Sequence, residues 1–287
     1  MATGTNIRTY FNGQWHDQDL PIMKAADQGT WLGSSVFDGA RSVAGLTPDL
    51  DLHCARVNKS AIAMALTPTC SPDLMLEIIH DGLRAYNPDA AVYIRPMYWG
   101  IDVDEAGLGP AADKTGFAIC LEEVAMPAAD AAITLTRTRF RRPVLENAVC
   151  NAKSGALYPN NARMLAEARS KGFANALVAD AVGNVAETAT ANIFFVQGST
   201  VVTPIPNGTF LAGITRQRHI ANLRAEGIEI IEKTVTFEEA ALADEAFLTG
   251  NFSKIMPVKC FDDRVYPSHK MATRARQLYW DWAASTP

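Results

Sequence analysis

Apolar residues in this 287-residue chain occur only in short runs, and the longest run without a polar residue is Ala61–Leu66. A helix that crosses a membrane needs roughly 20 consecutive apolar residues, so none is expected here. The first residues show no positive stretch followed by an apolar segment, so we expect no secretory signal peptide. Short apolar runs between turn residues favour strands and amphipathic helices packed around hydrophobic cores.

The charge and cysteine content exclude several function classes. A net charge of −5 at pH 7, without a cluster of like charges, provides no basic footprint for a nucleic acid. The cysteines are Cys54, Cys70, Cys120, Cys150 and Cys260. Their odd number and wide spacing argue against a disulfide framework and a zinc site, and the histidines form no HExxH motif. We expect a cytoplasmic protein without a metal ion, a nucleic-acid partner or a membrane partner.

The first half of the chain predicts a small α/β domain over residues 1–125. Asn12-Gly13 is a type I′ turn signal, which predicts a hairpin of Thr9–Phe11 and Gln14–His16. Ser35–Val43 predicts a strand that a turn at Phe37–Gly39 interrupts. Helices are expected over Leu52–Leu66 and from Ser71-Pro72-Asp73, and further strands over Ala91–Trp99 and Gly116–Val124.

Residues 126–131 are a predicted interdomain linker, and residues 132–287 predict a larger α/β domain. The strand Ala132–Arg137 is expected to end in a basic loop that runs to Pro143. A helix from Asn160 to Lys171 should end at Gly172, a typical C-cap. Other strands are expected over Asn175–Ala179, Ile193–Val196, Thr200–Thr203, Ile228–Thr234, Glu245–Leu248 and Ile255–Cys260, with helices after Gly213-Ile214-Thr215 and around Met271–Trp282. The pattern predicts two domains of the mixed α/β (α+β) class.

Two ionisable residues lie in segments of small residues that suit chemistry on a carbonyl compound. Lys153 lies in CNAKSG, where small neighbours let its amine approach a carbonyl carbon and partial desolvation would favour the neutral, nucleophilic amine. A solvated loop lysine is the alternative. Glu187 leads into a run of small residues, and if buried it needs a cationic partner such as a pyridinium nitrogen. If exposed, it has no such role.

Two further patterns favour the binding of anions. Gly213-Ile214-Thr215 precedes a predicted helix, so its backbone amides and the Thr215 hydroxyl suit a phosphate, although an ordinary helix cap is the alternative. Tyr93 and Arg95 alternate along one strand and therefore share a face. This pair favours a carboxylate receptor or, alternatively, a salt-bridged surface strand. Arg56 by itself is typical of a solvated helix face.

Several motifs occur together in an order that resembles the fold-type IV pyridoxal-phosphate enzymes, the family of the branched-chain aminotransferases. The motifs are SVFDGAR (Ser35–Arg41), YIRP (Tyr93–Pro96), NAKSGALY (Asn151–Tyr158), AETATANIFFV (Ala186–Val196), LAGITR (Leu211–Arg216), ADEAFLTGN (Ala243–Asn251) and IMPV (Ile255–Val258). The resemblance extends from Phe11 to about Phe261. It implies the two-domain fold of D-amino acid aminotransferase, pyridoxal 5′-phosphate as cofactor, and a homodimer or larger homo-oligomer.

The resemblance also implies a role for each matching residue. Lys153 would form the internal aldimine and later move a proton between Cα and C4′. Tyr158 would hydrogen-bond the phenolic oxygen of the cofactor, and Glu187 would pair with its protonated ring nitrogen. The phosphate would be held by Arg56, Ile214, Thr215 and Asn251, with Leu211 under the ring. The substrate carboxylate would be oriented by Tyr93, Arg95, Gly250, Asn251 and Phe252, and Phe37 would line the side-chain pocket.

The implied reaction is transamination of leucine, isoleucine or valine with 2-oxoglutarate. YIRP supports it because Arg95 suits a second carboxylate. Two segments depart from the branched-chain pattern: Leu32 stands where an aromatic residue is usual, and Gly107–Pro110 replaces the usual GMGV loop. These departures leave open a relative that acts on D-amino acids, (R)-amines or methionine. An aminodeoxychorismate lyase on the same fold and a non-enzymatic binding module are the remaining alternatives.

Overall fold

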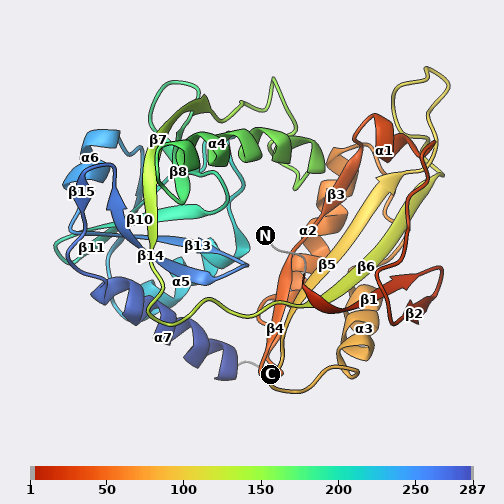
Figure 1. Ribbon diagram of the computed structural model, residues 1–287, viewed down its shortest axis with the longest axis horizontal. Coiled ribbons are helices and arrows are strands. Elements are labelled where there is room, and N and C mark those ends of the chain that lie inside the picture. The colour runs from red at the N-terminus through yellow and green to blue at the C-terminus, as the bar shows by residue number, and fades with distance from the viewer. Residues whose placement is uncertain (1–3, 286–287) are drawn as a thin grey trace. The chain divides into compact units, whose positions relative to one another are not determined.

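The computed structural model describes residues 4–285, which form two compact units (Figure 1). Unit 1 contains the residues up to 126 together with Asn151–Leu157, and unit 2 contains residues 127–150 and those from 158 onwards. Lys153 lies in unit 1, because the neighbouring Ser154 pairs with Val36 of the N-terminal sheet. The predicted division into residues 1–125, a linker over 126–131 and residues 132–287 stays a prediction.

Unit 1 is an antiparallel sheet with two long helices. Its strands are β1 (Thr5–Phe11), β2 (Gln14–His16), β3 (Ser35–Phe37), β4 (Ala40–Val43), β5 (Ala91–Gly100) and β6 (Thr115–Glu123). They pair in the order β2-β1-β6-β5-β3, and β4 also pairs with β5. The helices are α1 (Gln28–Trp31), α2 (Leu50–Ala63), α3 (Pro72–Leu83) and the 3-10 helix η1 (Gly155–Leu157). The two long helices, α2 and α3, contact each other and the sheet (Figure 1).

The turns of unit 1 form where the sequence predicts them. Asn12 has a φ of 51° and Gly13 a φ of 83°, the left-handed pair that a type I′ turn requires. The hairpin of β1 and β2 is therefore confirmed. The predicted interruption at Phe37–Gly39 is also confirmed, because β3 ends and β4 begins there.

Each long helix of unit 1 buries one apolar stripe. Cys54, Val57 and Ala61 recur at helical spacing on α2 and are fully buried in the core that α3 shares. The Ser71 hydroxyl caps α3 by accepting a hydrogen bond from the backbone nitrogen of Leu74 at 3.2 Å. Both predicted helices are confirmed, with α2 running from Leu50 to Ala63.

Unit 2 is built on a mixed sheet. Its strands are β7 (Ile133–Arg141), β8 (Asn175–Ala179), β9 (Val185–Thr188), β10 (Asn192–Gln197), β11 (Thr200–Pro204), β12 (Ile230–Lys233), β13 (Glu245–Gly250), β14 (Lys254–Phe261) and β15 (Arg264–Val265). They pair in the order β12-β11-β10-β13-β14-β7-β8-β9, and β15 pairs with β14. The pairs β11/β12, β14/β7 and β7/β8 are parallel, and the others are antiparallel.

The expected basic loop after Arg137 is wrong, because β7 continues to Arg141. This segment pairs in parallel with β8 as far as Ala179, so its backbone belongs to the sheet. Within β7, Arg137, Arg139 and Arg141 are exposed, and Thr136 and Thr138, which alternate with them, are buried. A run of charges alternating with small residues is thus a strand with one solvated face.

The helices of unit 2 cover the sheet. Phe194 and Phe247 stack with their centroids 5.1 Å apart and pack under α5 (Ile214–Ala225) and α7 (Lys270–Ser285). The other face of β10 packs against α6 (Phe237–Leu242), and α4 (Tyr158–Ser170) packs on β8. Gly172 follows α4 with a φ of 85°, as a glycine C-cap should. Within residues 4–285, no helix is long and apolar enough to cross a lipid bilayer.

His219 on α5 is fully buried in unit 2. Its Nε2 lies 3.2 Å from the carbonyl oxygen of Lys254, and its Nδ1 has no hydrogen-bond partner among the described residues. Burial lowers the pKa of His219 to about 4; the hydrogen bond to Lys254 opposes the shift, and the Lys254 charge adds to it. The folded chain therefore favours the neutral imidazole.

We predict that His219 makes folding sensitive to mild acid. Because its pKa is lower in the folded than in the unfolded chain, its contribution is present above pH 6.5 and is lost as the pH falls towards 4. At pH 5 the loss is about 2 kcal/mol. Urea unfolding at pH 7 and pH 5 checks this. The wild-type chain should lose more stability than His219→Gln over that interval, and equal losses would contradict the assignment.

Candidate active site

The segment that carries Lys153 is fixed against unit 1 at several atoms. The Lys153 backbone nitrogen donates to Ser60 Oγ at 3.1 Å, and the Lys153 carbonyl accepts from the Phe37 backbone nitrogen at 3.2 Å. The Lys153 Nζ lies 4.7 Å from the centroid of the Phe37 ring. A Cβ on Gly155 would lie 2.6 Å from Ser35 Oγ, so the small residues of this segment permit its close approach. The structure thus brings together the predicted pair Lys153 and Phe37.

Arg56 is held by a buried carboxylate that the sequence analysis did not single out. Its Nε and Nη2 each lie 2.7 Å from a different oxygen of Asp38, which also lies 2.7 Å from His53 Nδ1. Burial opposes ionisation of Asp38. The charges and hydrogen bonds of Arg56 and His53 outweigh it, so the pKa of Asp38 lies well below its usual range. The side chain of Arg56 is one-fifth exposed.

Helix α2 connects the Lys153 segment to the turn that carries Asp38. Arg56 and Ser60 are four residues apart and so lie on the same helix face. Arg56 binds Asp38, Ser60 binds the backbone of Lys153, and Phe37 precedes Asp38 in the turn between β3 and β4. We call Phe37, Asp38, Arg56, Ser60 and Lys153 the lysine cluster. In the sequence, the only indication of this cluster was the turn Phe37–Gly39. That turn by itself predicted a break between two strands and not a contact with Arg56.

Tyr93 and Arg95 share a face of β5, as predicted. The guanidinium carbon of Arg95 lies 5.2 Å from the centroid of the Tyr93 ring. Arg95 is paired with Glu122 of β6, which is only 3% exposed and also accepts a hydrogen bond from the Gly4 backbone nitrogen at 2.7 Å. The guanidinium carbon of the fully buried Arg41 lies 5.8 Å from the centroid of the same ring. The predicted carboxylate receptor therefore already contains a carboxylate of the chain.

The two segments that depart from the branched-chain pattern are joined by Gln28. Leu32 is half-buried at the end of α1, and its backbone nitrogen donates to the carbonyl of Gln28 at 2.8 Å. The side chain of Gln28 donates to the Leu108 carbonyl at 3.0 Å. The loop itself wraps Asp104, whose Oδ1 accepts from the backbone nitrogens of Leu108 and Gly109 at 3.2 Å each. The structure thus links Leu32 and Gly107–Pro110 within unit 1.

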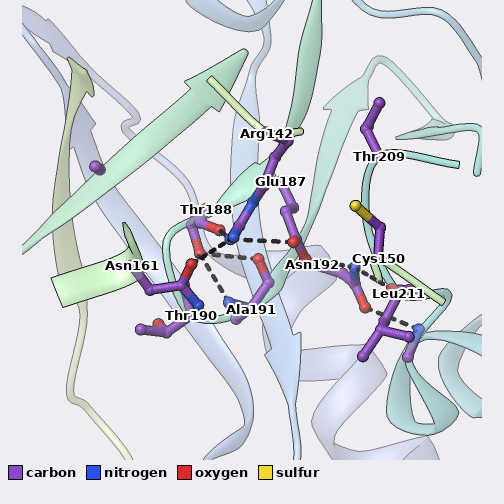
Figure 2. A network of polar contacts seen from close by, with 12 residues as sticks. Arg142, Cys150, Asn161, Glu187, Thr188, Thr190, Ala191, Asn192, Thr209 and Leu211 are labelled. Carbon is purple, nitrogen blue, oxygen red and sulfur yellow. Dashed lines mark hydrogen bonds and ion pairs between the residues drawn. The ribbon is translucent and has the colours of Figure 1, made fainter. Parts of the chain in front are cut away.

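Glu187 lies on β9 in unit 2 and is mostly buried, with 13% of its side chain exposed (Figure 2). One of its oxygens is 3.1 Å from Arg142 Nη2, and the other accepts from Asn192 Nδ2 at 3.1 Å. Arg142 also donates to Asn161 Oδ1 at 2.6 Å and to the Thr188 carbonyl at 2.7 Å. A buried arginine beside Glu187 favours its ionised form. Neither Arg142 nor Asn192 was singled out from the sequence, because nothing in their spacing connects them to Glu187.

Asn192 connects Glu187 to the start of helix α5. Its Nδ2 also donates to the Leu211 carbonyl at 3.1 Å, and its Oδ1 accepts from the Gly213 backbone nitrogen at 3.1 Å (Figure 2). A Cβ at Gly213 would lie 2.4 Å from that oxygen, so only glycine fits. The amide of Asn192 thereby sets where the N-terminus of α5 lies relative to Glu187.

Several polar groups near the N-terminus of α5 suit an anion. Gly213 is the N-cap residue of α5 and has no side chain to cap the helix, so the positive end of the helix follows at Ile214 and Thr215. Thr249 lies on the face of β13 that α5 covers, as its neighbour Phe247 shows. Within residues 4–285, the buried Thr249 Oγ1 and Asn251 Nδ2 have no hydrogen-bond partner. We call Gly213, Ile214, Thr215, Thr249 and Asn251 the anion cluster; its donors fit a phosphate group.

The remaining predicted residues are placed by the elements that carry them. Tyr158 is the first residue of α4, Leu211 precedes the anion cluster, and Gly250 ends β13. Phe252 is 37% exposed. The roles assigned to these residues, and to those of the two clusters, stay predictions.

Comparison with known proteins decides the family. Residues 35–261, most of the chain, match the amino-transferase class IV family. The chain belongs to the class IV aminotransferases. The resemblance to the branched-chain aminotransferases and the two-domain α/β fold are confirmed by this match and by the similarity to solved aminotransferase structures, among them the branched-chain enzyme of Escherichia coli (25% identity, TM-score 0.88, over 97% of this chain and 94% of that one).

The aminotransferase is similar to its relatives over nearly its whole length. It is 29% identical to a putative branched-chain-amino-acid aminotransferase of Methanocaldococcus jannaschii, over 95% of this chain and 94% of that one. It is also 29% identical to the branched-chain-amino-acid aminotransferase of Escherichia coli K12, over 91% and 87%. The crystal structure of an aminotransferase from Brucella abortus, bound to the cofactor PLP, is 52% identical with a TM-score of 0.95, over 97% and 99% of the two chains.

We predict that Gly213→Ala weakens phosphate binding by the aminotransferase. The new methyl group would overlap Asn192 Oδ1 and displace the N-terminus of α5. Inorganic phosphate should raise the Tm of the cofactor-free wild-type protein more than that of the variant. The control is Gln217→Ala, an exposed position on the same helix. An unchanged phosphate response in Gly213→Ala would contradict the assignment of the anion cluster.

Proposed function

We propose that this aminotransferase transfers the amino group of leucine, isoleucine or valine to 2-oxoglutarate. The observation that carries the proposal is the similarity to branched-chain-amino-acid aminotransferases over more than nine-tenths of the chain. The protein is a pyridoxal-phosphate-dependent aminotransferase. The unpartnered donors of the anion cluster and the anchored Lys153 fit that cofactor.

Lys153 performs the central steps in this proposal. Its amine would hold the cofactor covalently and, once released by the substrate amine, would act as the general base and acid that moves the proton from Cα. Bound pyridoxal phosphate supplies an electron sink for the carbanion at Cα. Because hydrogen bonds hold the backbone of Lys153, its flexible side chain can place the amine in fewer positions. This restriction favours correct positioning of the amine.

Residues of both clusters hold the cofactor in this proposal. Glu187, which Arg142 contacts, would pair with the ring nitrogen and favour its protonated form. Tyr158 would donate to the phenolic oxygen, and Leu211 would pack under the ring. Arg56, Ile214, Thr215 and Asn251 would provide donors to the phosphate. Asp38 keeps Arg56 ordered for this role.

Substrate recognition in this proposal uses Tyr93, Arg95 and the turn at Gly250, Asn251 and Phe252. Phe37 lines the side-chain pocket, and Leu32 with the Gly107–Pro110 loop adjusts its specificity. Because Arg95 is already paired with Glu122, an acceptor carboxylate must share or replace that partner. We further propose a cytoplasmic homodimer, by resemblance to the family.

We predict that Lys153→Ala folds normally and has no measurable turnover, because no other amine replaces it at the substrate. The unfolding transition and a transamination assay check both statements. The control is Lys59→Ala, an exposed lysine on α2 that should keep wild-type activity. Turnover by Lys153→Ala at the wild-type rate would refute the central assignment.

A half-reaction on the cofactor-loaded enzyme tests the substrate class. L-Leucine should change the absorbance of the bound cofactor, and 2-oxoglutarate should restore it. D-Alanine, (R)-1-phenylethylamine and 4-amino-4-deoxychorismate are tested separately. A change with D-alanine or the (R)-amine alone would replace the branched-chain proposal with a neighbouring specificity and direct attention to Leu32 and Gly107–Pro110. Release of pyruvate from aminodeoxychorismate would instead support a lyase.

We predict that substitutions of the paired residues Arg95 and Glu122 change the KM for 2-oxoglutarate in opposite directions. Arg95→Ala removes a charge-assisted contact and should raise KM for 2-oxoglutarate by about tenfold, with a smaller effect on leucine. Glu122→Gln frees Arg95 and should lower KM for 2-oxoglutarate. The control is Glu123→Gln, whose side chain contacts Asn6 instead. Equal effects of Arg95→Ala on both substrates would remove Arg95 from acceptor recognition.

A further inference from the structure

A buried lysine lies directly behind the anion cluster. Lys254, the first residue of β14, is 1% exposed. Its backbone has a φ of 60°, in the left-handed region that lysine rarely adopts. Its Nζ lies 2.7 Å from Asn251 Oδ1, across the turn that joins β13 to β14.

The ammonium decides which way the Asn251 amide is oriented. An ammonium has three donors and no acceptor, so it can bind only the oxygen of a carboxamide. With Oδ1 held by Lys254, Nδ2 must point the other way. Nδ2 is buried there and has no hydrogen-bond partner among residues 4–285. A buried donor without a partner is costly and indicates a ligand with acceptor atoms.

The same lysine is also connected to helix α5. The carbonyl oxygen of Lys254 lies 3.2 Å from His219 Nε2. His219 is four residues after Thr215, so both lie on one face of α5. The backbone of Lys254 therefore contacts the helix face whose first turn belongs to the anion cluster.

We propose that Lys254 is a positioning residue that orients the Asn251 amide so that its NH2 group donates to the phosphate of the cofactor. Without Lys254 the amide can rotate and present its oxygen to the phosphate, which repels it. The proposal rests on the proposed function only in taking the anion to be the cofactor phosphate. Lys254 acts through Asn251 and need not contact the phosphate itself.

A double-mutant cycle tests this mechanism. The dissociation constants of inorganic phosphate and of pyridoxal phosphate are measured with the cofactor-free wild-type protein, Lys254→Met, Asn251→Ala and the double variant. Each single variant should weaken the binding of both ligands by about tenfold, because each loses the same hydrogen bond from the Asn251 NH2 group to the phosphate. The double variant should be no weaker than Asn251→Ala alone. Lys254→Arg, which also offers only donors, should retain most of the affinity.

The control is Lys259→Met, which removes an exposed lysine from the same strand and should leave both affinities unchanged. A further tenfold loss on adding Lys254→Met to Asn251→Ala would show that Lys254 acts directly on the anion and would overturn the positioning role. Unchanged affinity in Lys254→Met would overturn it as well.

A measurement on the wild-type protein covers the case in which Lys254→Met does not fold. The side-chain NH2 resonances of Asn251 should shift when inorganic phosphate binds, and the absence of a shift would overturn the proposal. Failure of the branched-chain assignment is distinguishable, because it would appear in the leucine half-reaction and leave the phosphate cycle intact. Unchanged phosphate affinity in Lys254→Met, with normal leucine turnover by the wild-type enzyme, would refute the positioning role alone.

Discussion

The carboxamide of Asn192 is the contact on which the polar part of unit 2 depends. It accepts from Gly213 and donates both to Glu187 and to the Leu211 carbonyl, so it joins strand β9 to the start of α5. An amide is suited to this position because it offers donors and an acceptor at once and carries no charge beside the carboxylate. The glycine at 213 is required because that oxygen occupies the space of a Cβ.

The second constraint is that three arginines of the candidate site each pair with a carboxylate of the chain. Arg56 pairs with Asp38, Arg95 with Glu122, and Arg142 with Glu187. Such pairs fix long side chains before a ligand arrives, which reduces the ordering cost of binding. They also divide the site into groups that assist a ligand and groups that compete with it. Asp38 and Arg142 orient their partners, whereas Glu122 competes with any incoming carboxylate for Arg95.

Local patterns predicted the parts of the fold that depend on neighbouring residues. The Asn12-Gly13 hairpin, the Ser71 cap and the glycine after α4 all follow from backbone preferences within a few positions. The prediction failed at β7, where alternating arginines were taken for a loop, and at β9, where small residues gave no strand signal. β7 pairs in parallel with β8, and a pairing partner that distant in sequence leaves no local pattern. β9 forms a hairpin with β8 but is only four residues long, which is too short to show an alternating pattern.

The sequence by itself determined the family, the cofactor and the candidates Lys153, Glu187 and Thr215, because ordered motifs preserve the residue types that the chemistry requires. Only the tertiary structure decided their partners. Asp38, Glu122 and Arg142 come from elements that chain spacing does not connect to the motifs, and hydrogen-bond geometry alone joins them. The orientation of the Asn251 amide was likewise decided by Lys254, since a donor-only ammonium can bind only one end of a carboxamide.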